Sequence, residues 1–172
     1  MLDGVFRGPV DRAVRPIGRA LRRTGLSPDH LTIVGLVVGA LAAVAVATGR
    51  LILGLVLVIA AALPDLFDGA LAKASGTSSQ RGAFFDSTVD RITDAMLLGG
   101  IAWYLADVSS PHAAILPFAV SSVASVISYQ RAKAESLGLD AKGGLMERAE
   151  RIVLLCIGLL LEAVGLGGSL TV

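Results

Sequence analysis

Four aspartates lie within one 26-residue stretch of this chain, and their spacing is suited to binding metal ions. Asp65 and Asp68 are three residues apart, and Asp86 and Asp90 are four residues apart. On helices, residues at these spacings share one face. Four converging carboxylates would repel one another unless a cation neutralised them, and hard divalent cations such as Mg²⁺ prefer carboxylate oxygens. The pattern therefore predicts a carboxylate clamp, built by two helices, for one or two divalent metal ions.

Small and polar residues accompany these acids. Gly69 and Gly82 would let a phosphate or a sugar approach the helix backbone, and Ala72 keeps the same face small. Lys73 offers a point charge to a phosphate, and Thr77 offers a hydroxyl in the short loop between the acidic segments. A lone Asp-x-x-Asp or a lone glycine would be explained by helix capping or packing. The complete set rarely arises by chance, and it is suited to a ligand that contains pyrophosphate.

The acids lie at the junction of two apolar segments in a strongly hydrophobic chain. Of its 172 residues, 54% are hydrophobic, and the mean hydropathy is +0.74. The apolar runs have the length that spans a bilayer, which is unlike a soluble domain. The sequence therefore predicts an all-α polytopic membrane protein that forms a single domain, residues 1–172. We expect transmembrane helices over about 30–48, 51–73, 83–106, 112–135 and 149–166.

The basic residues predict the orientation of the chain in the membrane. Residues 1–25 carry apolar residues at helical spacing and six arginines on other faces, which predicts a juxtamembrane amphipathic helix on anionic lipid. A basic leader that only fixes the topology is the alternative. The basic loops all fall on one side, the cytoplasmic side, and the acids lie there too. We therefore expect a multi-pass protein of the cell membrane whose site faces the cytoplasm, with no nucleic acid as a partner.

The acidic segment resembles the signature of the CDP-alcohol phosphotransferase family, D-x2-D-G-x2-A-R-x8-G-x3-D-x3-D. Every spacing is kept at the matching residues, which are Asp65, Asp68, Gly69, Ala72, Gly82, Asp86 and Asp90. The one departure is Lys73, which keeps the charge of the arginine in the signature but loses its bidentate fork. The resemblance implies six transmembrane helices. Only five are visible in the sequence. Another helix could begin at residues 167–172, so we expect that the chain has been truncated there.

The resemblance also implies roles for these residues. Asp65, Asp68 and Asp86 would bind two metal ions, Mg²⁺ or Mn²⁺, and Asp90 would complete the metal site and act as general base. An acceptor hydroxyl would then attack the lipid-linked phosphorus of CDP-diacylglycerol and release CMP. A homodimer is implied as well. The residues that would contact the CDP-lipid are Asp68, Gly69, Ala72, Lys73, Thr77 and Gly82.

A second cluster concerns the acceptor. Arg131 and Lys133 end the fourth predicted span, and Arg148 and Arg151 open the fifth. They could bind a phosphorylated acceptor, or they could anchor the helices at the lipid headgroups, and their spacing alone does not decide. These segments resemble those of actinobacterial phosphatidylinositol phosphate synthases, Y-x-K-A-R-A-E and G-G-x-x-E-R-x-E-R, with Lys and Arg exchanged in the first. The resemblance implies inositol phosphate as the acceptor, and glycerol phosphate is the alternative within the family.

Two other classes of protein stay open. Intramembrane acids also build cation transport paths, and Pro64 could break the second span as transporters require. The acids lie at one interface, however, and no internal repeat is evident. An inactive, lipid-binding homologue is the other class, because Lys73 departs from the signature.

Overall fold

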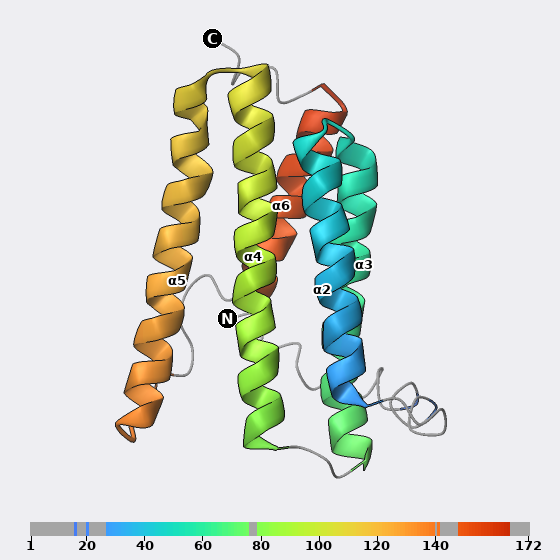
Figure 1. Ribbon diagram of the computed structural model, residues 1–172, viewed down its shortest axis with the longest axis vertical. Helices are drawn as coiled ribbons and strands as arrows, with labels where there is room; N and C mark the ends of the chain where they lie inside the picture. Colours follow the sequence, from blue (N-terminus) through green and yellow to red (C-terminus); the bar gives the residue numbers. More distant parts are fainter. Residues whose placement is uncertain are drawn as a thin grey trace.

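The computed structural model shows long helices side by side (Figure 1). It describes residues 16, 20, 27–75, 79–139, 141 and 148–165, without the side chains of 65, 66, 68–70 and 72–75. Apart from positions 16 and 20, the predicted amphipathic helix, residues 1–25, lies outside the described residues. The described elements are α2 (Pro28–Ala47), α3 (Leu51–Ser75), α4 (Gln80–Val108), the 3₁₀ helix η1 (Pro111–Ala114), α5 (Ile115–Ser136) and α6 (Arg148–Ala163).

The described part of the chain is helical and contains no strand, which confirms the all-α class. A helix lies at each of the five predicted ranges, with ends that differ by three residues at most. Within the described residues, two segments are long and apolar enough to cross a membrane. They are Pro28–Ala47, with a hydropathy of 2.3, and Pro111–Ser136, with 1.5, while Leu51–Pro64 is shorter. A membrane location is therefore supported, and the number of spans stays a prediction.

Local sequence explains where the helices begin and turn. Ser27 caps α2, because its side-chain oxygen accepts a hydrogen bond from the backbone N–H of His30. Ser79 caps α4 in the same way, accepting from the N–H of Gly82 at 3.0 Å. Between α2 and α3, Gly49 has a φ of 74°, a left-handed conformation that glycine adopts without strain. This turn sends α3 back along α2.

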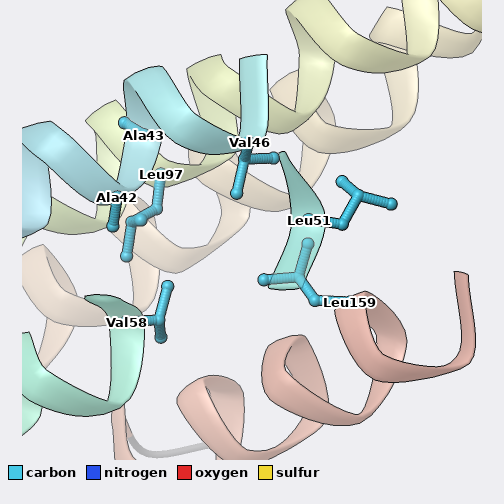
Figure 2. Close-up of a cluster of buried hydrophobic side chains, with 7 residues drawn as sticks. All are labelled: Ala42, Ala43, Val46, Leu51, Val58, Leu97 and Leu159. Carbon is cyan, nitrogen blue, oxygen red and sulfur yellow. The ribbon is translucent and has the colours of Figure 1, made fainter. Parts of the chain in front are cut away.

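One apolar core is shared by α2, α3, α4 and α6 (Figure 2). Each of the four helices contributes side chains, so α6 is tied to the first three helices although it comes last in the chain. In contrast, α5 packs only on α4 and η1 among the described elements, and it stands at the side of Figure 1. The clustered residues are Ala42, Ala43, Val46, Leu51, Val58, Leu97 and Leu159.

Two glycines let α2 and α4 approach closely. A Cβ atom at Gly39 would lie 2.6 Å from Cγ2 of Thr93, and a Cβ atom at Gly100 would lie 2.5 Å from the carbonyl oxygen of Ala43. Real Cβ atoms do not come so close, so a side chain at either position would force its neighbour to shift. The helix that carries Asp86 and Asp90 therefore lies close against α2, with its backbone at Gly100 next to the backbone of Ala43.

Pro64 does not break the second predicted span. It lies inside α3, which continues from Leu51 to Ser75. The feature that favoured the transport alternative is therefore missing, and the helix runs through Pro64 as the predicted span over 51–73 does. Proline within a helix removes one backbone hydrogen bond, which neighbouring helices can tolerate by packing around it.

Candidate active site

Five of the predicted site residues lie on the C-terminal half of α3. The backbone is helical through all of them, so Asp65 and Asp68 share a face by their three-residue spacing. Their side chains lie outside the described part of the structure, as does the whole of Thr77. The five residues on α3 are Asp65, Asp68, Gly69, Ala72 and Lys73.

The remaining signature residues lie on the first half of α4. Gly82 is in the first turn of that helix and donates its backbone N–H to the capping hydroxyl. Asp86 and Asp90 follow at intervals of one turn, and both are partly buried. The helix thus turns both carboxylates away from bulk water, where a charged group needs a partner.

Asp90 borders a small pocket that four helices line. Arg148 of α6 lies on the pocket wall, and α3 contributes Ala61 and Pro64. Since Asp65 directly follows Pro64, the acidic segment of α3 begins at the edge of the pocket that Asp90 borders. The two acidic segments therefore approach the same place. The other lining residues are Thr32, Gly35, Leu36, Val89 and Thr93.

Ion pairs join α4 to the start of α6 beside this pocket. Nη1 of Arg148 lies 2.9 Å from Oδ1 of Asp90, and Nε of Arg148 lies 3.6 Å from Oδ1 of Asp94. Nη2 of Arg151 donates to Oδ2 of Asp94 at 2.5 Å. All four side chains are only 14–17% exposed, so each charge depends on its partner. Arg91 is a looser neighbour, with Nη1 3.9 Å from Oδ2 of Asp90.

Asp94 is a further acid of the site that was not predicted from the sequence. It lies four residues after Asp90, which itself lies four residues after Asp86, so three acids recur at one-turn intervals on α4. The family signature ends at Asp90, and for that reason the third acid escaped notice. Its spacing was the available signal, because three carboxylates on one face of an apolar helix need an explanation.

The predicted acceptor cluster divides between two helices. Arg148 and Arg151 open α6 and meet the acids of α4, as described above. Arg131 and Lys133 are exposed near the end of α5, where Nε of Arg131 lies 3.2 Å from Oε1 of Glu135 one turn later. In the described part of the chain, α5 and α6 do not pack against each other. The structure thus brings two of the four cations to Asp90, and the four-residue pocket stays a prediction.

The donor set fits a divalent metal ion. Asp86 and Asp90 supply carboxylate oxygens, and a carboxylate has about four acceptor positions, so Asp90 can bind Arg148 and still serve a metal ion. No three potential ligands gather at one place among the described side chains. Two of the four predicted ligands, Asp65 and Asp68, are not among those side chains.

Comparison with known proteins identifies the family. The chain matches the family model of CDP-alcohol phosphatidyltransferase over residues 26–169. The phosphatidylinositol phosphate synthase of Corynebacterium glutamicum is 39% identical over 163 residues, which are 92% of this chain and 74% of the relative. The enzyme of that name from Mycolicibacterium smegmatis is 38% identical, over 84% of this chain and 66% of the relative. The chain thus spans about two thirds to three quarters of these relatives.

Solved structures agree with the sequence comparison. The crystal structure of Mycobacterium tuberculosis phosphatidylinositol phosphate synthase with CDP-DAG bound has a TM-score of 0.80 and 34% identity, over 88% of this chain and 77% of that one. The same enzyme in complex with manganese and citrate gives 0.77 and 35%, over 84% and 70%. These matches favour an enzyme over a transporter. By sequence and by fold, this chain belongs to the CDP-alcohol phosphatidyltransferase family.

Proposed function

We propose that this protein transfers a phosphatidyl group from CDP-diacylglycerol to inositol phosphate and releases CMP. One observation carries the proposal: Arg148 lies 2.9 Å from Asp90, and Arg151 lies one turn further along α6. A general base beside two guanidinium groups suits an alcohol that also bears a phosphate. The names of the relatives support inositol phosphate, since the matched enzymes are phosphatidylinositol phosphate synthases.

The proposed reaction follows from the positions of these residues. The acceptor's phosphate rests on Arg148 and Arg151, and one of its hydroxyl groups gives its proton to Asp90. The acceptor oxygen then forms a bond to the lipid-linked phosphorus, and the bond from that phosphorus to CMP breaks. Arg148 has five N–H donors, so it can bind a carboxylate and a phosphate together. On the CDP-lipid side, the proposed contacts are Asp68, Gly69, Ala72, Lys73, Thr77 and Gly82.

We assign two divalent ions, Mg²⁺ or Mn²⁺, to Asp65, Asp68, Asp86 and Asp90. Bound ions of this kind stabilise the attacking and leaving oxygens of a phosphoryl displacement. The manganese complex of the M. tuberculosis enzyme supports a metal site in the family. The chain's own part is to hold the acids on two rigid helices beside one pocket.

The setting of the reaction belongs to the same proposal. The protein crosses the cell membrane several times, its site opens to the cytoplasm, residues 1–25 lie on the membrane surface, and two copies form a homodimer. Two described segments suited to span a membrane support the membrane location, and the one-sided distribution of basic residues supports the orientation. The soluble acceptor would enter from the cytoplasm, and the CDP-lipid would enter from the bilayer.

Glycerol phosphate is the second candidate acceptor, which would make the protein a phosphatidylglycerophosphate synthase. Arg131 and Lys133 stand in exchanged order relative to the resembled synthases, and they lie on α5, apart from α6 in the described residues. The union of these two residues with Arg148 and Arg151 in one pocket therefore stays a prediction. Both candidates carry a phosphate, so both fit Arg148 and Arg151.

An acceptor panel tests the proposal. Purified protein with CDP-diacylglycerol and Mg²⁺ is given inositol phosphate, free inositol or glycerol phosphate, and CMP release is measured. We expect the highest kcat/KM with inositol phosphate. A preference for glycerol phosphate would change the acceptor and keep the phosphate site, whereas a preference for free inositol would refute that site. No CMP release with any acceptor would indicate an inactive homologue in which Lys73 cannot replace arginine.

A further inference from the structure

Asp94 is a charged residue that lies mostly buried between helices, where removing a charge from water is unfavourable. Its side chain is 14% exposed, next to the fully packed Thr93 and one turn before the buried Leu97. Both of its oxygens face cations, since Oδ1 lies 3.6 Å from Nε of Arg148 and Oδ2 lies 2.5 Å from Nη2 of Arg151. Well-packed apolar residues stabilise a helix contact at least as well as a buried ion pair does. Packing alone therefore does not explain an acid here.

The two arginines lie where their positive charges are unfavourable, and Asp94 compensates for this. Arg148 and Arg151 occupy the first turn of α6. A helix N-terminus carries partial positive charge and favours acids, so two guanidinium groups there are repelled by the helix and by each other. Asp94 supplies the opposing charge from α4. Its two oxygens contact different guanidinium groups, so one carboxylate fixes both.

We propose that Asp94 is a positioning residue, which orients Arg148 and Arg151 toward Asp90 so that both can receive the acceptor's phosphate. The inference rests on the proposed function in one respect, that the acceptor carries a phosphate. Arg148 contacts Asp94 through Nε and Asp90 through Nη1, so Asp94 also sets the distance between the base and the phosphate site. Side chains held in the binding geometry lose less entropy when the ligand arrives, which strengthens binding.

An acid near a bound phosphate would ordinarily weaken the binding of that phosphate by repulsion. The repulsive effect of Asp94 and its orienting effect therefore predict opposite results. Asp94 and Asp90 together offset the charges of Arg148 and Arg151, so the phosphate depends on the N–H donors, because one guanidinium has five of them and can bind a carboxylate and a phosphate together. If orientation dominates, removing the carboxylate weakens acceptor binding. If repulsion dominates, removing it strengthens acceptor binding.

The first test separates the two substrates. Asp94→Asn keeps the shape of the side chain and removes its charge. We expect it to raise the acceptor KM about tenfold or more, the size of a lost charge-assisted hydrogen bond, with the CDP-diacylglycerol KM within about twofold of wild type. Asp107→Asn is the matched control, because Asp107 is exposed on the same helix and lies roughly 20 Å away by helical rise. It should leave both KM values unchanged.

A second test asks whether Asp94 acts through Arg151. Arg151→Ala alone should raise the acceptor KM, and adding Asp94→Asn should raise it by a smaller factor than Asp94→Asn does in the wild type, because only the contact with Arg148 is left to lose. Asp94→Glu keeps the carboxylate and should restore part of the acceptor affinity. A residue needed only for folding would instead lower the melting temperature and change both KM values together.

The outcomes for Asp94 and for the proposed function are distinguishable. The wild-type acceptor panel reports on the proposed function, and the KM comparison is then made with whichever phosphorylated acceptor the wild type prefers. The inference about Asp94 is overturned by an unchanged or lower acceptor KM in a folded Asp94→Asn variant, by multiplicative effects with Arg151→Ala, or by a wild type that uses only alcohols without phosphate.

Discussion

The contact between Asp90 and Arg148 connects two sequence motifs that lie 58 residues apart. The sequence indicated both residues, one as a base in the acidic signature and one in a basic cluster. It could not indicate that they touch, because the packing of α6 on the other helices decides which cations reach the acids. The one-turn spacing could have indicated Asp94 as a third acid on α4, but not its two partners, which come from α6.

At the scale of single residues, the substitution of Asp90 should lower the rate of the reaction. Asp90→Asn should reduce kcat by at least about 10²-fold, the usual size of a general-base contribution, while the CDP-diacylglycerol KM stays near wild type. CMP release under saturating substrates measures this, with Asp107→Asn as the control. A wild-type kcat in the folded variant would assign the base elsewhere.

The substitution of Arg148 should weaken the binding of the acceptor. Arg148→Ala should raise the acceptor KM about tenfold or more and leave the CDP-diacylglycerol KM nearly unchanged, because the lost bonds are charge-assisted contacts to phosphate. Arg50→Ala removes an exposed arginine in the turn between α2 and α3 and serves as the control. If Arg148 only anchored the helix, the two KM values would move together or not at all.

At the scale of elements, apolar runs and capping residues were sufficient to place five helices within three residues of their observed ends. The span predicted over 51–73 passes through Pro64, and α3 is indeed continuous there, although proline by its local chemistry permits a break. The separation of α5 from α6, in contrast, could not be predicted. Basic residues at the ends of two helices look like one cluster in sequence, and only the packing shows which helices are neighbours.

The close approach of α2 and α4 gives a stability prediction. In Gly100→Ala, the new Cβ atom would lie 2.5 Å from the carbonyl oxygen of Ala43, and the two helices must separate to admit it. We expect a loss of about 1–3 kcal/mol, the usual effect of overpacking, seen as a lower melting temperature in detergent. Gly99→Ala is the control, because its Cβ atom would meet nothing within 4 Å and it improves helix propensity. Equal melting temperatures for the two variants would show that this contact is not tight.

For the whole molecule, four of the described helices share a core and line a pocket at which Asp90 meets Arg148. The all-α class, the family and the enzyme class could be predicted from the sequence, because the signature spacing is specific and the apolar runs are long. The metal clamp stays a prediction, because the side chains of Asp65 and Asp68 lie outside the described structure. The four-residue acceptor pocket stays one too, since the backbones of α5 and α6 do not pack against each other in the described residues.

Metal removal tests the acidic clamp as a unit. Excess EDTA should abolish CMP release, and added Mg²⁺ or Mn²⁺ should restore it, because four carboxylates cannot otherwise share one site in the ionised state. Asp86→Asn should weaken Mn²⁺ binding, measured by calorimetry on the purified protein, whereas Asp107→Asn should not. Full activity in EDTA would exclude a metal-dependent mechanism.

The lipid product identifies the reaction that the protein catalyses. The protein is incubated with CDP-diacylglycerol, Mg²⁺ and an equimolar mixture of inositol phosphate, free inositol and glycerol phosphate, and the new lipid is identified by its mass. We predict phosphatidylinositol phosphate as the main product, formed in step with CMP and absent in EDTA. Phosphatidylinositol as the main product, or no new lipid at all, would contradict the account.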